Sequence, residues 1–333
     1  MSYPPQPSSP APGAPPVPGA PPGPVPGGAP VPGAPPVPGA VPPPGAPAGG
    51  IYSSPIPIVT THLGHAFASE WTKIRSVRST MWTLGIMLFL VVGVGFLIAL
   101  AMSTDDWVGA PLLSGGLFGL MLGQICIVTL GVLVITSEYG TGMIRTTLTA
   151  SPQRWRVLAA KAVVFFVLAF VLTTAACAIT ALIHSAVLGG QTVPDYETRD
   201  PMFKDSVSDS GELIATGGEW FDATVGAALY VSLLGLLALA VGAILRHSAG
   251  AITTMVGFIL LPLIIALFMQ AESLRDVQRK LIEYSPLSGL ASLFGIPFFE
   301  DADLGGWGLL GLLAAVTGGM LLLAFALLSK RDV

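Results

Sequence analysis

The first long apolar run in the chain reads, from Met81 to Met102, MWTLGIMLFLVVGVGFLIALAM. It contains no charged residue. An α-helix needs about 20 predominantly apolar residues to cross the hydrocarbon core of a bilayer. The run is therefore predicted to be a transmembrane helix.

Five further charge-free runs follow the first one along the chain. Together, the six predicted spans cover residues 81–102, 112–136, 162–188, 223–245, 249–269 and 307–328. Of the 333 residues, 52% are hydrophobic and only 10% are charged, whereas soluble proteins carry about 25% charged residues. We therefore expect an all-α membrane protein with six transmembrane helices, and the composition excludes a water-soluble globular domain.

The chain begins with a low-complexity tail, residues 1–61. Residues 1–57 hold 23 of the 30 prolines, and the nonamer PGAPPVPGA occurs at Pro12–Ala20 and again at Pro32–Ala40. Such a Pro/Gly/Ala-rich segment is predicted to be disordered and partly polyproline II. It lacks the basic start and apolar core of a secretory signal, so we expect it to stay attached and cytoplasmic. It is either an entropic, solubilising tail or a docking strand for a polyproline-binding partner.

The charged residues indicate how the spans are oriented. With the tail inside, the cytoplasmic side collects ten basic and three acidic residues, and the outer side collects five basic and sixteen acidic residues. Basic residues in short loops mark the cytoplasmic side. Both termini are therefore predicted to be cytoplasmic in a multi-pass protein of the cell membrane, and the residue usage suggests a bacterial source.

Two outer connections are longer than simple turns. Residues 189–222 form an acidic loop, and residues 272–303 form a second segment in two parts. In its first part, Leu274, Val277, Leu281 and Tyr284 recur at the spacing of an amphipathic helix. In its second part, Pro286–Phe299 is apolar but too short to span, so it is predicted to be interfacial or re-entrant.

A helix is also predicted just before the first span, over residues 62–79. Its apolar stripe runs through Leu63, Phe67, Trp71, Ile74 and Val77, and the basic residues beside it suit the inner surface of a membrane. Glu70 projects into this stripe, where a carboxylate without a partner would be costly. Either Glu70 pairs with a cation, or this face of the helix packs on protein rather than lipid.

The segment that leaves the second predicted span carries a distinctive pattern. It reads SEYGTGMIRTTLTASPQRWR from Ser137 to Arg156, and Lys161 follows at the start of the third span. A span that ends in Glu, followed by Gly-Thr, Arg-x-Thr-Leu, a Pro, a basic pair and a Lys, resembles the ABC-2-type permease family, the membrane subunits of a class of ATP-binding-cassette transporters. The sequence ASEWTK at Ala68–Lys73 and the order of the spans are also similar to that family, so the resemblance covers residues 62–333.

The resemblance implies a function, partners and a set of functional residues. In that family, a short coupling helix between spans two and three meets a cytoplasmic ATPase. The resemblance assigns ATPase coupling to Glu138, Gly140, Thr141, Arg145, Thr146, Pro152, Arg154, Arg156 and Lys161, and it matches Glu70, Trp71, Lys73 and Arg78 to the N-terminal interfacial helix. It also implies a separate ATP-binding subunit, a homodimer or heterodimer of permease subunits, and ATP-driven transport, mostly export, of lipids, polysaccharides, peptides or drugs.

The chemistry of the residues agrees with part of this assignment. Gly140 and Gly142 permit a tight turn off the span, and Glu138 lies within reach of Arg145 through such a turn. The basic residues of this loop make a surface that suits an acidic partner. Charge alone fits equally well with topology signals and lipid contacts.

Motifs for chemistry within the chain are missing from its sequence. None of the five lysines stands in a Walker A loop, so the chain is predicted not to be an enzyme and to use ATP only through a partner subunit. The four histidines are scattered, so neither a metal site nor a bound cofactor is expected, and no nucleic-acid partner is expected either.

The predicted spans hold almost no ionisable residues in their interiors. Asp, Glu, Lys and Arg are absent there, and the one candidate, His184, lies near the outer end of its span. This argues against a proton-coupled carrier. The alternatives to a permease are an ATP-independent channel or membrane scaffold and, with less support, a membrane-embedded enzyme.

Two spans carry stripes of small residues. Gly115, Gly119 and Gly123 are spaced by four on the second span, and Gly311, Ala315 and Gly319 are spaced by four on the sixth. Small residues at this spacing let helices approach closely. Each stripe is predicted to pack either within the subunit or against a second subunit.

Overall fold

The structure is a computed structural model that describes residues 62–104, 109–143, 146, 154–194, 198, 201–203, 206–299, 302 and 304–330. The chain divides into two units at Ile58, and the second unit, Val59–Val333, contains all of the described residues. The predicted disordered tail lies outside the described residues, as does most of the predicted coupling helix.

The second unit contains six helices long and apolar enough to cross a membrane, which confirms the predicted number of spans. They are α2 (Arg78–Met102), α3 (Gly116–Gly140), α5 (Arg154–Leu188), the continuous stretch α6–η2–α7 (Gly217–Phe221, Asp222–Gly226 and Ala227–Leu245), α8 (Ser248–Phe268) and α11 (Gly306–Lys330). In the described part of the chain, two isolated bridges are the only β-structure. The fold class is therefore all-α, as predicted.

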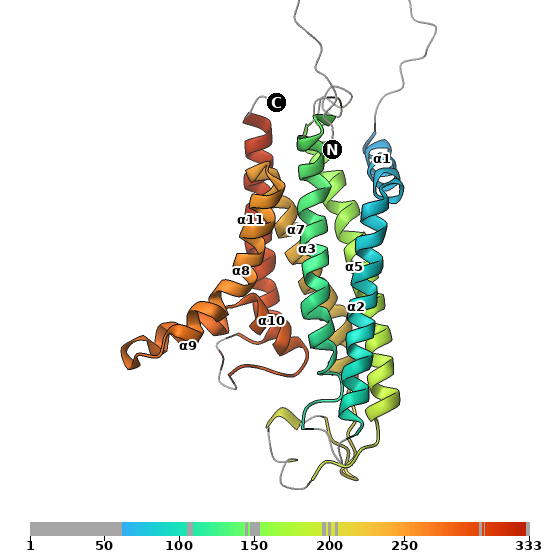
Figure 1. Cartoon of the computed structure of the whole chain (residues 1–333), viewed down its shortest axis with the longest axis vertical. Coiled ribbons are helices and arrows are strands. Elements are labelled where there is room, and N and C mark those ends of the chain that lie inside the picture. The colour runs from blue at the N-terminus through green and yellow to red at the C-terminus, as the bar shows by residue number, and fades with distance from the viewer. Residues whose placement is uncertain are drawn as a thin grey trace, which may run out of the picture. The chain divides into compact units, whose positions relative to one another are not determined.

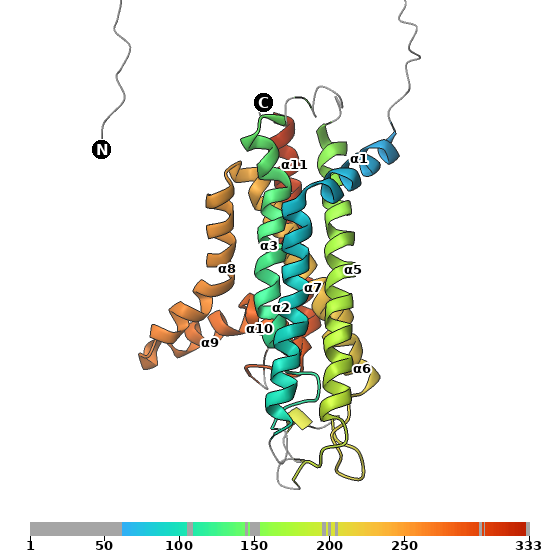
Figure 2. The same cartoon turned by 45° about the vertical axis from the view of Figure 1, so that its right-hand side comes forward.

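The helices pack around α3 and α7, which lie at the centre of the bundle in Figures 1 and 2. Helices α2 and α5 lie on one side of this pair, and α8 and α11 lie on the other (Figure 1). Glycines allow the two central helices to touch, because a Cβ atom on Gly131 would clash with the carbonyl oxygen of Gly235. Most of the large exposed apolar side chains lie on the outward faces of the spans, where a bilayer would cover them.

The two stripes of small residues differ in whether they pack against a neighbouring helix. On α3, the stripe faces α2, since a Cβ atom on Gly119 would meet the backbone of Val91 and one on Gly123 would meet the Val91 side chain. On α11, a Cβ atom added to Gly311 or Gly319 would meet no atom of the described residues within 4 Å. The stripe on the second span therefore packs within the subunit, and the stripe on the sixth does not.

The predicted N-terminal helix is present as α1 (Leu63–Ser76). It ends three residues earlier than expected because Val77 adopts an extended conformation, and α2 then starts at Arg78 in a different direction (Figure 2). Leu63 and Trp71 are exposed, as expected of a lipid-facing stripe, whereas Ile74 is buried against the bundle. One side of α1 therefore packs on protein.

The predicted amphipathic helix before the last span is present as a short 3-10 turn, η3 (Glu272–Leu274), followed by α9 (Arg275–Glu283). Figure 1 shows α9 projecting sideways from the bundle, and the apolar side chains of Leu274, Val277 and Tyr284 are exposed. The apolar segment that follows turns back as α10 (Pro286–Leu293), which packs against α11 and α7. The 14-residue segment therefore does not span, which agrees with its length.

The long loop before α6 has its own internal order where the structure describes it. Isolated bridges join Thr192 to Glu212 and Val207 to Leu213. A capping box then starts α6, in which the backbone N–H of Glu219 donates to the Thr216 side chain and the Glu219 carboxylate accepts from the backbone N–H of Thr216.

Candidate functional site

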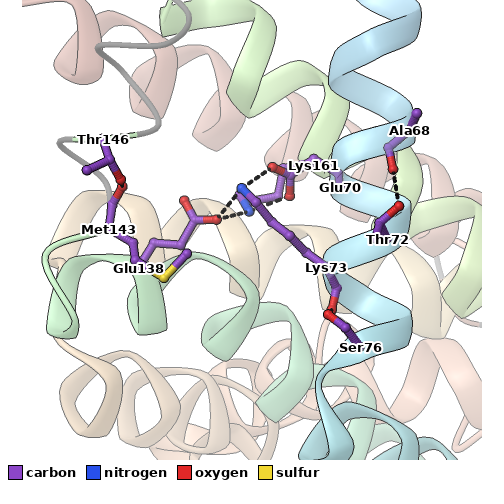
Figure 3. A network of polar contacts seen from close by, with 9 residues as sticks. All are labelled: Ala68, Glu70, Thr72, Lys73, Ser76, Glu138, Met143, Thr146 and Lys161. Carbon is purple, nitrogen blue, oxygen red and sulfur yellow. Dashed lines mark hydrogen bonds and ion pairs between the residues drawn. The ribbon is translucent and has the colours of Figure 1, made fainter.

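Four charged side chains from three helices meet at the end of the bundle next to α1 (Figure 3). Lys161 Nζ on α5 lies 2.6 Å from Glu70 Oε2 on α1 and 2.9 Å from Glu138 Oε1 on α3. Lys73 Nζ on α1 lies 2.8 Å from Glu70 Oε1 and 3.0 Å from Glu138 Oε1. Each lysine thus bridges both glutamates, and we call these four residues the ionic cluster.

Local sequence explains how each member reaches the cluster. Glu70, Lys73 and Ile74 share one side of α1, which is the side that packs on protein. Glu138 lies in the last turn of α3, where the negative end of the helix dipole disfavours a carboxylate without a cation beside it. Lys161 is brought to the same level because α5 begins at Arg154, eight residues before the predicted start of its span.

The cluster is buried, and this makes its balance of charges important. The side chains of Glu70, Glu138 and Lys161 are at most 7% exposed, and that of Lys73 is 30% exposed. Burial of an ion costs several kcal/mol, and mutual attraction offsets this cost only when the geometry and the additional hydrogen bonds are good. Two glutamates and two lysines cancel in charge, so no net charge is buried.

The protonation of Lys73 reflects this environment. Desolvation, the largest single effect, lowers its pKa, but hydrogen bonds and charge interactions with Glu70 and then with Glu138 outweigh it. The net result is a pKa raised above the usual 10.5. Lys73 therefore stays charged at neutral pH and binds both carboxylates.

A cavity of about 350 Å³ adjoins the ionic cluster. Its walls come from α1, the first turns of α2 and the last turns of α3. Leu130, Leu133 and Val134 form an apolar wall along α3, and Val77 and Met143 also line it. Because Val77, Leu133 and Met143 are exposed, the cavity opens to the outside of the bundle.

One atom of the cluster has no partner among the described residues. Glu138 Oε2 is buried, and among the described residues no donor lies within hydrogen-bonding distance of it. Figure 3 shows the Glu138 side chain between Met143 and the two lysines. Both Glu138 and Met143 line the cavity, so the unpaired oxygen belongs to a residue of the cavity wall, although the oxygen itself is buried.

The cluster shows how Glu70 is accommodated in the apolar stripe of α1. The alternatives were pairing with a cation and packing against protein, and the structure has both, since Glu70 pairs with two lysines and α1 packs on α5. Glu138 was predicted to lie within reach of Arg145. Arg145 is outside the described residues, and the partners that the structure gives Glu138 are Lys73 and Lys161. Sequence analysis missed this four-residue arrangement.

The other residues predicted for ATPase coupling are only partly described. Pro152 and the side chain of Arg154 lie outside the described residues, as does Arg145. Thr141 and Thr146 are exposed, and each hydroxyl donates 2.8 Å to a backbone carbonyl, that of Ser137 and that of Met143 respectively. The Arg156 guanidinium lies 5.6 Å from the ring centroid of Trp155, its neighbour in sequence.

The turn at the end of α3 depends on one of its two glycines. Gly142 has a φ of +72°, a conformation that favours glycine. Gly140 is the last residue of α3 and does not have a positive φ. In the predicted N-terminal interfacial helix, Trp71 and Arg78 are both exposed and take no part in the ionic cluster.

His184 has a packing position inside the bundle. It is fully buried on α5, with Nε2 2.9 Å from the Gly95 carbonyl of α2 and Nδ1 3.2 Å from the Leu112 carbonyl that precedes α3. Within the part of the chain that the structure describes, no three His, Cys, Asp or Glu residues group as a metal site would require. Through its two ring nitrogens, His184 therefore links α5 to the backbone of α2 and to the segment that precedes α3.

No protein-family model matches this chain, and no curated protein matches it at a significant level. The ABC-2-type resemblance of residues 62–333 thus rests on the sequence pattern alone.

Proposed function

We propose that this chain is the permease subunit of an ATP-binding-cassette transporter and forms the membrane pathway for transport driven by a separate ATP-binding subunit. The observation that carries the proposal is the ionic cluster. It joins the N-terminal helix to the end of α3 and the start of α5, and residues 141–153 run between those two points. The segment proposed to meet the ATPase is therefore anchored on both sides by one buried network.

This arrangement suits mechanical coupling. A push on residues 141–153 acts on Glu138 at one end and on Lys161 near the other. Because both side chains also contact α1 residues, α1, α3 and α5 move together or the buried pairs must separate. Separation leaves unpaired charges, so concerted movement is favoured. In this proposal the 141–153 segment holds the coupling helix, and its one arginine, Arg145, binds an acidic surface of the ATPase together with Arg154 and Arg156 just after the segment.

The proposed topology places the ionic cluster and both termini on the cytoplasmic side. Ten basic residues on that side satisfy the rule that relates basic loops to the cytoplasm. Helix α1 then lies at the inner membrane surface, with exposed Trp71 toward the head groups and its Glu70 side on the bundle. The acidic 189–222 loop and α9 face outward, and the host membrane is a bacterial cell membrane.

The remaining parts of the proposal follow from the family resemblance. Direction is export, the substrate is one of the classes that the family carries, and two permease subunits form the pathway. The unused stripe of small residues on α11 offers a surface for close approach of a second subunit. ATP hydrolysis and cofactor binding belong to the partner.

The test is a mild-detergent purification of the tagged chain from its native membrane, assayed for a bound ATPase and for ATPase activity. We expect an ATP-binding-cassette subunit to co-purify, and Arg145→Glu to release it or to abolish its stimulation. Arg275→Glu is the matched control, because it reverses the charge of an exposed arginine at the first residue of α9, outside the proposed coupling segment. A chain that purifies without any ATPase, or an Arg145→Glu variant that couples normally, overturns the proposal in favour of an ATP-independent channel or scaffold.

A further inference from the structure

The ionic cluster leaves two complementary hydrogen-bonding groups at the wall of the adjoining cavity. Glu138 Oε2 is a buried acceptor to which no described residue donates. Lys73 Nζ has three N–H groups, and its bonds to Glu70 and Glu138 account for two of them. Lys73 is also the most exposed member of the cluster, and it lines the cavity. The residues of the wall thus supply one buried acceptor to which no described residue donates, and one charged donor.

The charge of the cluster restricts what can bind there. Its two lysines and two glutamates cancel, and the cluster is largely out of water. A ligand with a net charge would leave that charge uncompensated in a partly buried site, which is costly. A zwitterion that carries a donor for Glu138 Oε2 and an anionic acceptor for Lys73 satisfies both groups and keeps the site neutral.

The place of the cavity indicates where such a ligand comes from. Helices α2 and α3 each have 25 residues, and a helix of that length spans about 37 Å, longer than the roughly 30 Å hydrocarbon core. Their ends at Arg78 and Gly140 therefore reach the head-group level, where the cavity lies. Its apolar wall of Leu130, Leu133 and Val134 runs from Glu138 toward the middle of the span.

We propose that this cavity binds the head group and first acyl carbons of a membrane phospholipid whose head carries a protonated primary amine. Because Glu138 Oε2 is buried, binding requires the Glu138 carboxylate to turn toward the cavity. The ammonium then donates to Glu138 Oε2, the phosphate accepts from Lys73 Nζ, and the acyl chain leaves past Leu133. A volume of about 350 Å³ holds this part of the lipid and lies in the range of about 300–1,000 Å³ usual for ligand pockets. A choline head cannot take this place, because its quaternary nitrogen has no N–H to donate.

The experiment is native mass spectrometry of the full chain released from nanodiscs that hold equal amounts of ethanolamine-, choline- and glycerol-headed phospholipids with the same acyl chains. We expect one ethanolamine-headed lipid to be retained with about a tenfold preference over the choline-headed one, the factor expected for one charge-assisted hydrogen bond. Equal retention of the three lipids, or a preference for the anionic glycerol head, overturns the proposal.

A matched pair of variants connects the preference to the cavity. Val134→Phe places a larger apolar side chain in the cavity and leaves the four charged residues unchanged. The phenyl ring takes the space of the acyl carbons, so retention of the ethanolamine-headed lipid should fall by about tenfold. Val171→Phe makes the same change at an exposed position of α5 and should retain the lipid as the wild type does. Wild-type retention by Val134→Phe overturns the proposal. The measurement needs no ATPase partner, so its outcome is independent of the proposed transport function.

Discussion

Lys161 Nζ lies 2.6 Å from Glu70 Oε2, and this contact joins two side chains 91 positions apart that are both almost fully buried. Helix α1 cannot leave α5 without exposing one buried charge and stranding the other. The N-terminal helix is therefore part of the folded bundle, in addition to any contact it makes with lipid.

The first prediction concerns Lys161. Lys161→Met leaves Glu70 and Glu138 with Lys73 as their one remaining partner in the cluster, and removal of one member of a buried ion pair costs about 3–5 kcal/mol. We expect a loss of this size in the free energy of unfolding, measured by denaturant titration in mixed micelles. Lys330→Met, at the exposed end of α11, is the control and should change stability by less than about 0.5 kcal/mol. Equal stabilities of the two variants would contradict the role given to the cluster.

The spans were predictable because each needs about 20 apolar residues without charge, and every predicted span overlaps one of the six helices. The helix ends were less predictable. Arg154, Arg156 and Lys161 are charged, so a search for apolar runs starts the third span at residue 162, whereas α5 begins at Arg154. Backbone hydrogen bonding of α5 continues through these charged residues, and a search for apolar runs cannot detect that part of the helix.

The ionic cluster shows a second limit of sequence analysis. Arg145, which was expected to lie within reach of Glu138, is outside the described residues, and the partners that the structure gives Glu138 lie 23 and 65 positions from it in sequence. Glu70 in an apolar stripe was the available signal, and it left pairing with a cation and packing on protein as alternatives, both of which the structure shows. Which lysines supply it depends on how α1, α3 and α5 pack together, and a helical period carries no information about that.

The second prediction concerns alkaline pH and Lys73. The pKa of Lys73 is raised in the folded state above its usual value of 10.5, which applies to the unfolded chain. The stabilisation from Lys73 is therefore complete below pH 10.5 and is lost as the pH rises through the folded-state pKa. The stability difference between wild type and Lys73→Met should therefore stay constant from neutral pH to about pH 10 and shrink above it. Thermal unfolding of both proteins in the same detergent across this range measures the difference. A difference that shrinks below pH 9 would contradict the direction of the shift.

The third prediction compares glycines on two helices. Gly119→Ala places a methyl group against the backbone of Val91, which cannot move aside without displacing α2. Overpacking of this kind costs about 1–3 kcal/mol. Gly311→Ala on α11 meets no atom within 4 Å and should leave the unfolding free energy of the isolated chain unchanged or slightly higher. If both variants are equally stable, α2 and α3 are not in the close contact described.

The fourth prediction tests the proposed orientation. Ser69 on α1 and Ser210 in the long loop are both exposed. In a background in which the two native cysteines, Cys126 and Cys177, are changed to alanine, each serine is replaced by cysteine in turn. Because the proposed orientation places α1 on the cytoplasmic side, a membrane-impermeant maleimide applied to intact cells should label Ser210→Cys and leave Ser69→Cys unlabelled. Permeabilised cells are the control and should give labelling at both positions. Labelling of Ser69→Cys alone in intact cells would reverse the topology, and the ionic cluster and the 141–153 segment would then be unable to meet a cytoplasmic ATPase.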